Sequence, residues 1–192
     1  MKDETWTSEE FVPSHEGRVG VLLADGTVPK PVYFDSNSGS GGWDVRHWSV
    51  YDGRDHPRRP RAAVLRAECS CGWTGEDRTV DWTAVVDLPF RDSGLQDADR
   101  CQEDWDRHIG DVRETTIPLP AELETLLERV TAAIDQLGQD APLAALKAAR
   151  TLEIIAQRTA HCPAQHARAQ EPALVAAALG LNTDEARKLT TR

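Results

Sequence analysis

The chain has 192 residues and a mass of 21.2 kDa, enough for one large domain or two small ones. Its 22 basic and 32 acidic side chains give a formal net charge of -10, which argues against coating nucleic acid or an anionic membrane through bulk charge. The composition, 40% apolar and 28% charged, is that of a globular rather than a disordered protein. No apolar run is long enough to cross a membrane, and Met1-Lys2-Asp3-Glu4 begins no hydrophobic signal segment. We therefore expect a cytoplasmic protein without a membrane span, whose four cysteines are thiols or metal ligands.

Aromatic residues and acidic charge are concentrated in the first part of the chain. All eleven aromatic residues lie between Trp6 and Trp105. Residues 1–116 carry 14 basic and 23 acidic side chains, whereas residues 117–192 carry 8 and 9. Pro118 and Pro120 disfavour helix at the boundary between the two parts. We expect an acidic, Trp-rich domain over residues 1–116 and an alanine-rich helical domain over residues 117–192. The negative charge that argues against non-specific binding along nucleic acid therefore lies mainly in the first domain.

The N-terminal domain is predicted to be rich in antiparallel strands. Residues 19–23 and 31–34 form one expected hairpin around Asp25-Gly26, and residues 43–51 and 62–69 form a second pair. A flexible loop is expected over residues 37–42, which are polar and glycine-rich. The arginine-rich segment 52–61 is expected to be a solvated hairpin tip, although it could also contact phosphate.

The most specific motif of this domain is Cys69-Ser-Cys71-Gly72-Trp73-Thr-Gly75. Two cysteines at i and i+2 on a strand point to the same face, so both sulfur atoms can bind one ion. Such a pair is weaker support for zinc than the commoner CxxC spacing. The alternative is that both cysteines are small buried apolar side chains.

Two further ligands are expected in the helical segment 99–108. Cys101, Trp105 and His108 lie on one helix face, but seven helical residues separate Cys101 from His108 by about 10.5 Å along the axis. A tetrahedral ion accommodates both only with strained or convergent side chains. Hence either Cys69, Cys71, Cys101 and His108 together hold one structural zinc ion, or only one of the last two binds and His47 or His56 completes the set.

The C-terminal domain is predicted to be all-helical. One helix begins at Pro120 and is expected to end at Gly138, and its apolar residues follow a 4-3-4-3 spacing. This stripe fits an intramolecular packing face better than a dimer seam, because it covers little more than two heptads. A second helix is expected from Pro142 to about Thr159, with a chain break at His161-Cys162-Pro163.

The last residues have the pattern of a helix-turn-helix. Gly180 follows the small residue Ala176 by four positions and precedes Ala186 by six, which allows a left-handed turn between two closely crossing helices. Thr183 is the expected N-cap of the second helix. Because the second helix of such a pair enters the major groove of DNA, we expect base or phosphate contacts from its polar residues. These candidate DNA-binding residues are Asn182, Thr183, Arg187, Lys188 and Thr191.

These features together resemble a family of uncharacterised helix-turn-helix proteins from high-GC actinobacteria. Its members combine a Trp-rich N-terminal segment, the CxCGWxG motif and a Trp-x-x-His helix, here Trp105 and His108, with an alanine-rich helical tail. The resemblance covers roughly residues 43–192. It implies metal binding in the N-terminal domain and DNA binding in the C-terminal domain. From the strand and helix patterns we expect an α+β protein with an antiparallel N-terminal domain.

The sequence favours a sequence-specific DNA-binding transcriptional regulator, either a homodimer or bound to a partner protein through its N-terminal domain. The alternative is an adaptor whose acidic, Trp-rich domain binds a protein, with the helix pair serving only as core. An enzyme is not expected, because G-x-S-x-G, P-loop, HExxH and nucleotide-binding motifs are absent from the sequence.

Overall fold

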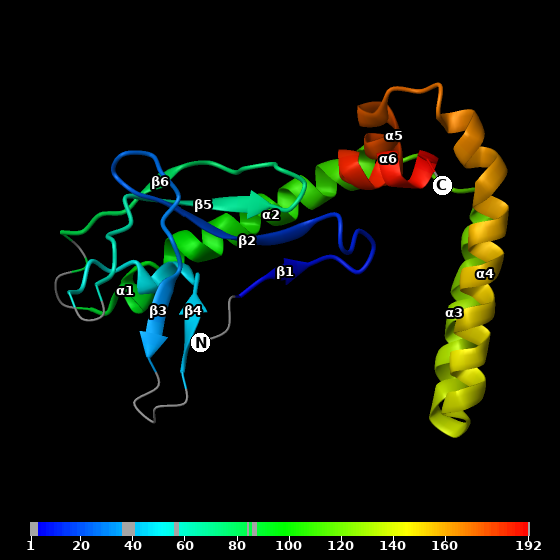
Figure 1. Ribbon diagram of the computed structural model, residues 1–192, viewed down its shortest axis with the longest axis horizontal. Coiled ribbons are helices and arrows are strands. Elements are labelled where there is room, and N and C mark those ends of the chain that lie inside the picture. Colours follow the sequence, from blue (N-terminus) through cyan, green and yellow to red (C-terminus); the bar gives the residue numbers. More distant parts are fainter. Residues whose placement is uncertain (1–3, 36–40, 56–57, 84, 86–87, 192) are drawn as a thin grey trace. The chain divides into compact units, whose positions relative to one another are not determined.

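The computed structural model describes residues 4–35, 41–55, 58–83, 85 and 88–191 (Figure 1). The chain separates into two compact units, Met1–Glu114 and Thr115–Arg192, which are described individually below. The first unit contains antiparallel sheets and the second is helical, so the predicted α+β class is confirmed. Residues 37–40 of the expected flexible loop lie outside the described residues.

The N-terminal unit is built on a four-stranded antiparallel sheet in the order β1-β2-β5-β6. These strands are β1 (Trp6–Thr7), β2 (Glu16–Leu22), β5 (Val64–Cys69) and β6 (Arg78–Thr79). Along β5, half-buried and buried residues alternate, as expected for a strand with one face on the core. A separate two-stranded ribbon pairs β3 (Val32–Asp35) with β4 (Gly42–Val45).

The strand positions were largely predicted, but their pairing was not. The turn at Asp25-Gly26 forms, with Gly26 in a left-handed conformation, yet β2 does not continue into a hairpin with β3. Pro29 and Pro31 follow the turn and have no N–H to donate to a ladder, which explains why the pairing stops. Instead, β2 pairs with β5 over six residues, and residues 48–50 form a short 3-10 helix rather than a strand.

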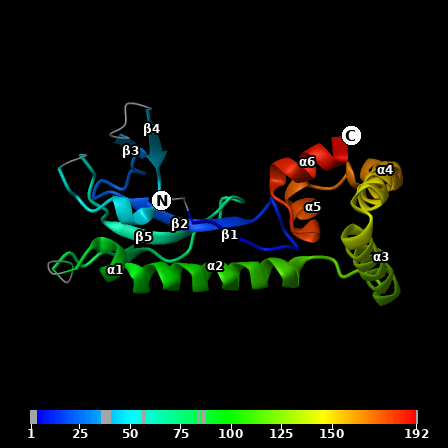
Figure 2. The same ribbon diagram turned by 90° about the horizontal axis from the view of Figure 1, so that it is seen from below.

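One long helix covers the sheet. Figure 2 shows α2 (Leu95–Thr115) lying along β2 and β5, with the short helix α1 (Phe90–Ser93) before it. The core contains apolar side chains from both layers, including the fully buried Leu65 of β5 and Cys101 of α2. Gly17 permits the close approach of helix and sheet, because an added Cβ would lie 2.5 Å from the indole nitrogen of Trp105.

The C-terminal unit begins with a helical hairpin of α3 (Ala121–Asp140) and α4 (Pro142–Ala167). Gly138 does not end the first helix as predicted but lies inside it, where an added Cβ would be 3.8 Å from Ala145 of α4. The predicted break at Pro163 is also wrong, because α4 continues through it. Proline removes only one helical hydrogen bond, and the alanine-rich turns on either side favour helix.

The chain ends in a pair of short helices, α5 (Pro172–Leu179) and α6 (Thr183–Thr191). Gly180 between them is left-handed, with φ 62° and ψ 35°, and the buried Ala176 and Ala186 form the helix contact with Val175. Asn182, rather than the predicted Thr183, caps α6, because its side-chain oxygen accepts a hydrogen bond from the Glu185 N–H at 2.9 Å. Among the described residues, no helix has the length and apolar character needed to cross a membrane.

Candidate metal centre

Four potential metal ligands come together in the N-terminal unit: His15, Cys69, Cys71 and His108. One nitrogen or sulfur atom from each lies within 4.8 Å of the others. The Sγ of Cys71 is 3.4 Å from Nε2 of His108, and the Sγ of Cys69 is 3.6 Å from Nδ1 of His15. The edge of a tetrahedral zinc site with sulfur and nitrogen ligands is about 3.6 Å. The group could therefore hold a metal ion such as zinc.

The two cysteines are presented by a tight turn at the end of β5, which we call the cysteine turn (residues 69–73). Its ends are joined by a hydrogen bond from the Cys69 N–H to the Trp73 carbonyl at 2.9 Å. Gly72 has φ 95°, a conformation that side chains with a Cβ resist. The Trp73 N–H donates to the Cys71 Sγ at 3.4 Å. Such a bond stabilises a thiolate, which is the form that ligates metals.

His15 is brought to this turn by sheet pairing and by Ser70. Gly17 of β2 lies opposite Cys69, so the chain just before β2 passes beside the cysteine turn. The Ser70 hydroxyl donates to the Ser14 carbonyl at 2.9 Å and accepts from the Glu16 N–H at 2.8 Å, which holds the backbone on both sides of His15. Sequence reasoning missed His15 because it paired β2 with the wrong strand. Only the β2–β5 register reveals it.

His108 is contributed by α2 and is held by an aromatic stack. Its ring lies parallel to that of Trp73, with an interplanar angle of 3° and a centroid separation of 4.3 Å. It also lies 5.4 Å from the His15 ring. One face of α2 therefore carries both Trp105, which packs on the sheet, and His108. This arrangement orients the imidazole towards Cys71.

Burial and hydrogen bonding shift the pKa values of the Cys69 and Cys71 thiols in opposite directions. A hydrogen bond from Cys71 lowers the pKa of the Cys69 thiol far below its ordinary value, opposed by burial and assisted by His108 and His15. The same bond, together with burial, raises the pKa of Cys71. Because metals bind cysteine as the thiolate, a metal ion at this pair would displace the proton of Cys71. Nε2 of His15, the ring nitrogen opposite the one that faces Cys69, is buried without a hydrogen-bond partner among the described residues.

Cys101 is not a member of the group, although the sequence placed it with Cys69, Cys71 and His108. It lies two helical turns before His108, its side chain is fully buried, and burial raises the pKa of its thiol to about 11. Its Sγ is not among the ligand atoms that lie within 4.8 Å of one another, which are those of His15, Cys69, Cys71 and His108. Of the two candidate ligands on α2, only His108 therefore lies with Cys69 and Cys71.

His47, one of the two other alternative ligands, is also not a member of the group. His47 stacks on Trp48 with ring centroids 5.4 Å apart, and the Ser49 N–H donates to its Nδ1 at 3.3 Å. His56 lies outside the described residues. In the arginine-rich segment, Arg61 lies over the Trp82 ring at 4.4 Å and Arg59 pairs with Asp52 at 3.0 Å. Arg59 is half-buried and Arg61 is exposed, and both contact other side chains of the unit.

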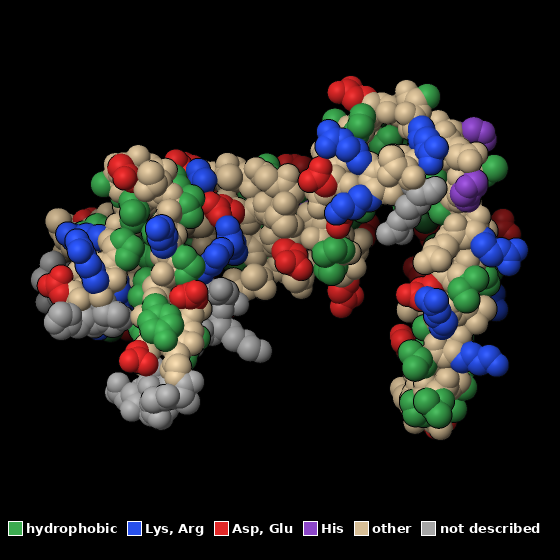
Figure 3. Space-filling view, viewed as in Figure 1, with side chains coloured by type: hydrophobic (Ala, Val, Ile, Leu, Met, Phe, Trp, Pro, Cys, Tyr) green, Lys and Arg blue, Asp and Glu red, His purple; other side chains and the backbone are tan. Residues whose placement is uncertain are grey.

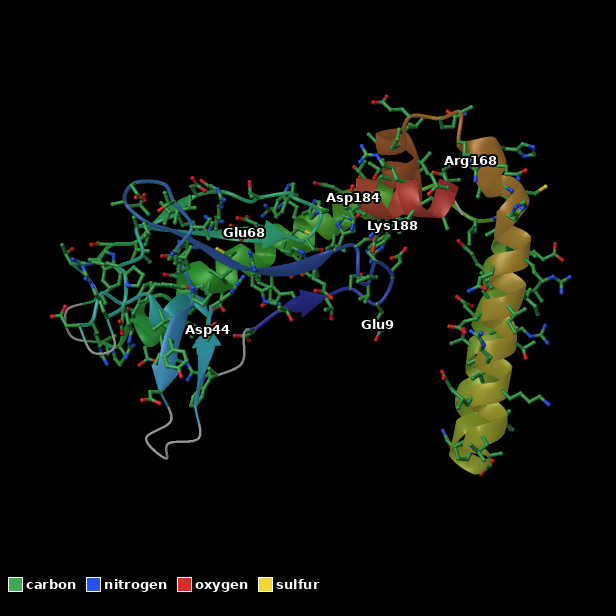
Figure 4. All side chains as sticks on the ribbon, in the orientation of Figure 1. Glu9, Asp44, Glu68, Arg168, Asp184 and Lys188 are labelled. Atoms are coloured by element: carbon green, nitrogen blue, oxygen red, sulfur yellow. The ribbon has the colours of Figure 1, made fainter. Side chains whose placement is uncertain are left out.

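The predicted DNA-binding residues all lie on or next to α6. Thr183, Arg187, Lys188 and Thr191 are exposed, whereas Asn182 is half-buried and caps the helix. Figure 4 shows Lys188 and Asp184 on this helix, with Arg168 following α4. Arg187 pairs with Asp184 at 3.2 Å, so an acidic side chain accompanies the basic pair.

No family model, curated protein or solved structure matches this chain. The resemblance to actinobacterial helix-turn-helix proteins consequently stays a prediction.

Proposed function

We propose that the N-terminal unit holds one structural zinc ion through His15, Cys69, Cys71 and His108. The observation that carries this proposal is the mutual approach of the four ligand atoms to within 4.8 Å. Two sulfur and two nitrogen ligands suit a tetrahedral zinc ion, and four protein ligands leave no open coordination position for catalysis. The ion would connect the segment before β2, the cysteine turn and α2. Its role is to hold the sheet and its covering helix together.

Metal analysis of matched variants tests this site. The chain purified without chelator should contain about one zinc ion, and Cys71→Ser and His15→Ala should lose it. Cys101→Ser and Cys162→Ser should retain it, although each also removes one thiol. Cobalt in place of zinc should give the visible absorption of a tetrahedral centre. Zinc lost from Cys101→Ser but retained in His15→Ala, or no zinc in the wild-type chain, would reject the proposed ligand set.

We further propose that α5 and α6 bind a specific DNA site and that the protein is a transcriptional regulator. Two observations support this proposal: Ala176, Ala186 and the left-handed Gly180 form the close contact between the two helices, and Arg187 and Lys188 of α6 are exposed. Arg187 and Lys188 can donate to bases or phosphates. Residues 168–192 contain only four basic and three acidic side chains, so we expect weak non-specific affinity.

Selection from a pool of genomic DNA at moderate salt tests this second proposal. The wild-type chain should enrich a defined sequence, and Lys188→Ala should weaken its binding by roughly 5- to 150-fold if the lysine contacts a base. Lys147→Ala, which removes the same charge from α4, is the matched control and should bind normally. If the wild-type chain enriches no sequence, the DNA-binding proposal fails.

An adaptor is the second candidate, and one observation favours it. Tyr33 and Trp43, on the β3–β4 ribbon, are 54% and 51% exposed, and exposed aromatics are typical of protein-binding surfaces. The other five tryptophans are buried or half-buried and serve the core, so this ribbon alone carries the argument. A protein that cross-links to the wild-type chain in cells but not to Trp43→Ala would support the adaptor. Equal cross-linking by both would reject this surface.

A further inference from the structure

The α3–α4 hairpin leaves its apolar side chains largely uncovered. None of the described side chains of α3 is buried, and Ala145 is the one buried residue of α4. The hairpin nevertheless carries a stripe of large apolar residues on both helices, which we call the apolar hairpin face. Its members, 37–51% exposed, are Leu123, Leu127, Val130, Leu137, Leu152 and Ile155. Figure 3 shows apolar side chains along this hairpin at the molecular surface.

Two helices alone cannot shield such a face. Each helix in a two-helix hairpin contacts its neighbour along a single line, so apolar residues beside that line stay half-exposed. Val130 of α3 and Leu152 of α4 are 38% and 39% exposed, as expected for such residues. Adding a second hairpin completes a four-helix bundle, in which every helix has two neighbours and the apolar stripes meet at the centre. The apolar hairpin face is therefore suited to packing against a second helical hairpin of similar length.

The charges of the two helices indicate which partner. α3 carries five acidic side chains and one arginine, whereas α4 carries three basic side chains and one glutamate. Among the described ion pairs, none joins the two helices; the pair Arg150–Glu153 lies within α4. These opposite charges are consequently available to another chain. When two copies pack as antiparallel hairpins, each acidic α3 lies between its own basic α4 and the basic α4 of the partner.

We propose that a second copy of this chain covers the apolar hairpin face and forms a two-fold symmetric four-helix bundle. An isologous dimer uses the same face on both copies, which suits a hairpin that is charged oppositely on its two helices. With 20 residues, α3 is about 30 Å long. Two helices side by side, each about 10 Å wide, therefore present a flat face of about 600 Å². This is comparable to the roughly 800 Å² that each partner contributes to a stable interface. The dimer goes beyond the proposed zinc site and does not depend on DNA binding.

Sedimentation of the full chain over a range of concentrations tests the dimer. The wild-type chain should be a dimer, and Leu127→Glu/Ile155→Glu should be a monomer because four carboxylates would enter the bundle core. Leu174→Glu introduces the same charge at a residue of α5 that is 59% exposed, and should leave the dimer intact. A wild-type monomer at every concentration, or a dimer that survives the double substitution, would overturn the proposal.

A charge-reversal experiment tests the partner's identity with surface substitutions that do not enter the core. Glu124→Lys/Glu128→Lys/Asp135→Lys makes both helices basic, and Lys147→Glu/Arg150→Glu makes both acidic. Each variant alone should dimerise at least roughly tenfold more weakly at low salt, and an equimolar mixture should form a heterodimer. Circular dichroism should show unchanged helix content in each. If mixing the two folded variants restores no dimer, the second copy is not the partner.

Discussion

The two units of the chain differ in how much of their apolar surface they bury. The N-terminal unit packs α2 on a sheet, encloses most of its tryptophans, and brings four metal ligands together at one end. The C-terminal unit buries little within the described residues: Ala145 of the hairpin and the small cluster of Val175, Ala176 and Ala186. The first unit thus has an enclosed core and a group of potential metal ligands, whereas the second consists of two helix pairs with exposed apolar faces.

Because of this difference, we expect the stability of the two units to depend on different conditions. A unit whose layers are joined through metal ligands should depend on the metal and not on protein concentration. A unit whose apolar faces await a second copy should depend on protein concentration and not on the metal. The predictions below use this contrast, in order of decreasing expected effect.

Removal of the metal should have the largest effect, and only on the N-terminal unit. Structural zinc contributes about 10–16 kcal/mol of apparent binding free energy in zinc-finger peptides, more than most small domains have in total stability. A strong chelator should therefore abolish the melting transition of the N-terminal unit, monitored by tryptophan fluorescence. The helical signal of the C-terminal unit should persist. A tryptophan transition that is unchanged in chelator would contradict the metal-dependent stability.

Truncation of a buried leucine should distinguish the two kinds of core. Leu65→Ala should lower the free energy of unfolding of the N-terminal unit by about 2–5 kcal/mol, because Leu65 is fully buried in β5. Leu174→Ala, at an exposed residue of α5, should change stability by only about 0.5 kcal/mol. Urea denaturation measures both. Equal effects would mean that the contrast in burial has no energetic consequence.

Alkaline pH should weaken the N-terminal unit through Cys101. Burial raises the pKa of its thiol to about 11 from an ordinary value of 9.0, so the folded state retains the proton more tightly than the unfolded state. The resulting stabilisation is present below pH 9 and is lost as pH rises towards 11, by about 2 kcal/mol at pH 11.

Denaturation at several pH values measures this loss. Cys101→Ala should remove this part of the pH dependence, and Cys162→Ala, at an exposed cysteine, should leave it unchanged. The interpretation would fail if wild type and Cys101→Ala lost stability in parallel between pH 9 and 11.

The smallest effect concerns the helix pair of the C-terminal unit. Asn182→Ala should destabilise α6 by about 1 kcal/mol, because its side chain accepts the hydrogen bond from the Glu185 N–H. Thr183→Ala should cost less, since Thr183 is already inside the helix. Thermal denaturation followed by circular dichroism compares the two. If Thr183→Ala lowered the thermal stability more than Asn182→Ala, Thr183 would be the N-cap, as expected from the sequence.

Local patterns predicted the elements well where short-range chemistry decides them. The turn residues at Asp25-Gly26, the left-handed position of Gly180 and the helical face of Trp105 and His108 follow from backbone preferences and periodicity. Gly138 and Pro163 were misread as helix ends, because their local preference for ending a helix is small compared with the helical tendency of the alanine-rich sequence around them.

The candidate metal site was predicted only in part, for a physical reason. Cys69 and Cys71 are neighbours in sequence, and the spacing on one helix restricts the choice between Cys101 and His108. His15 is far from all of them along the chain, and only the β2–β5 register places it beside the cysteine turn. Pairing of distant strands depends on side-chain packing across the whole sheet, which a local pattern does not contain.

The sequence by itself determined the α+β class, the acidic aromatic first part, the cysteine pair and the small residues of the last two helices, because composition and short spacings encode them. Tertiary structure alone decided that His15 lies with the potential metal ligands, that Cys101 remains in the core, and that Asn182 caps α6. It also decided that the α3–α4 hairpin is left uncovered. Each of these outcomes depends on which surfaces meet in space, a property of packing between elements rather than of any single segment.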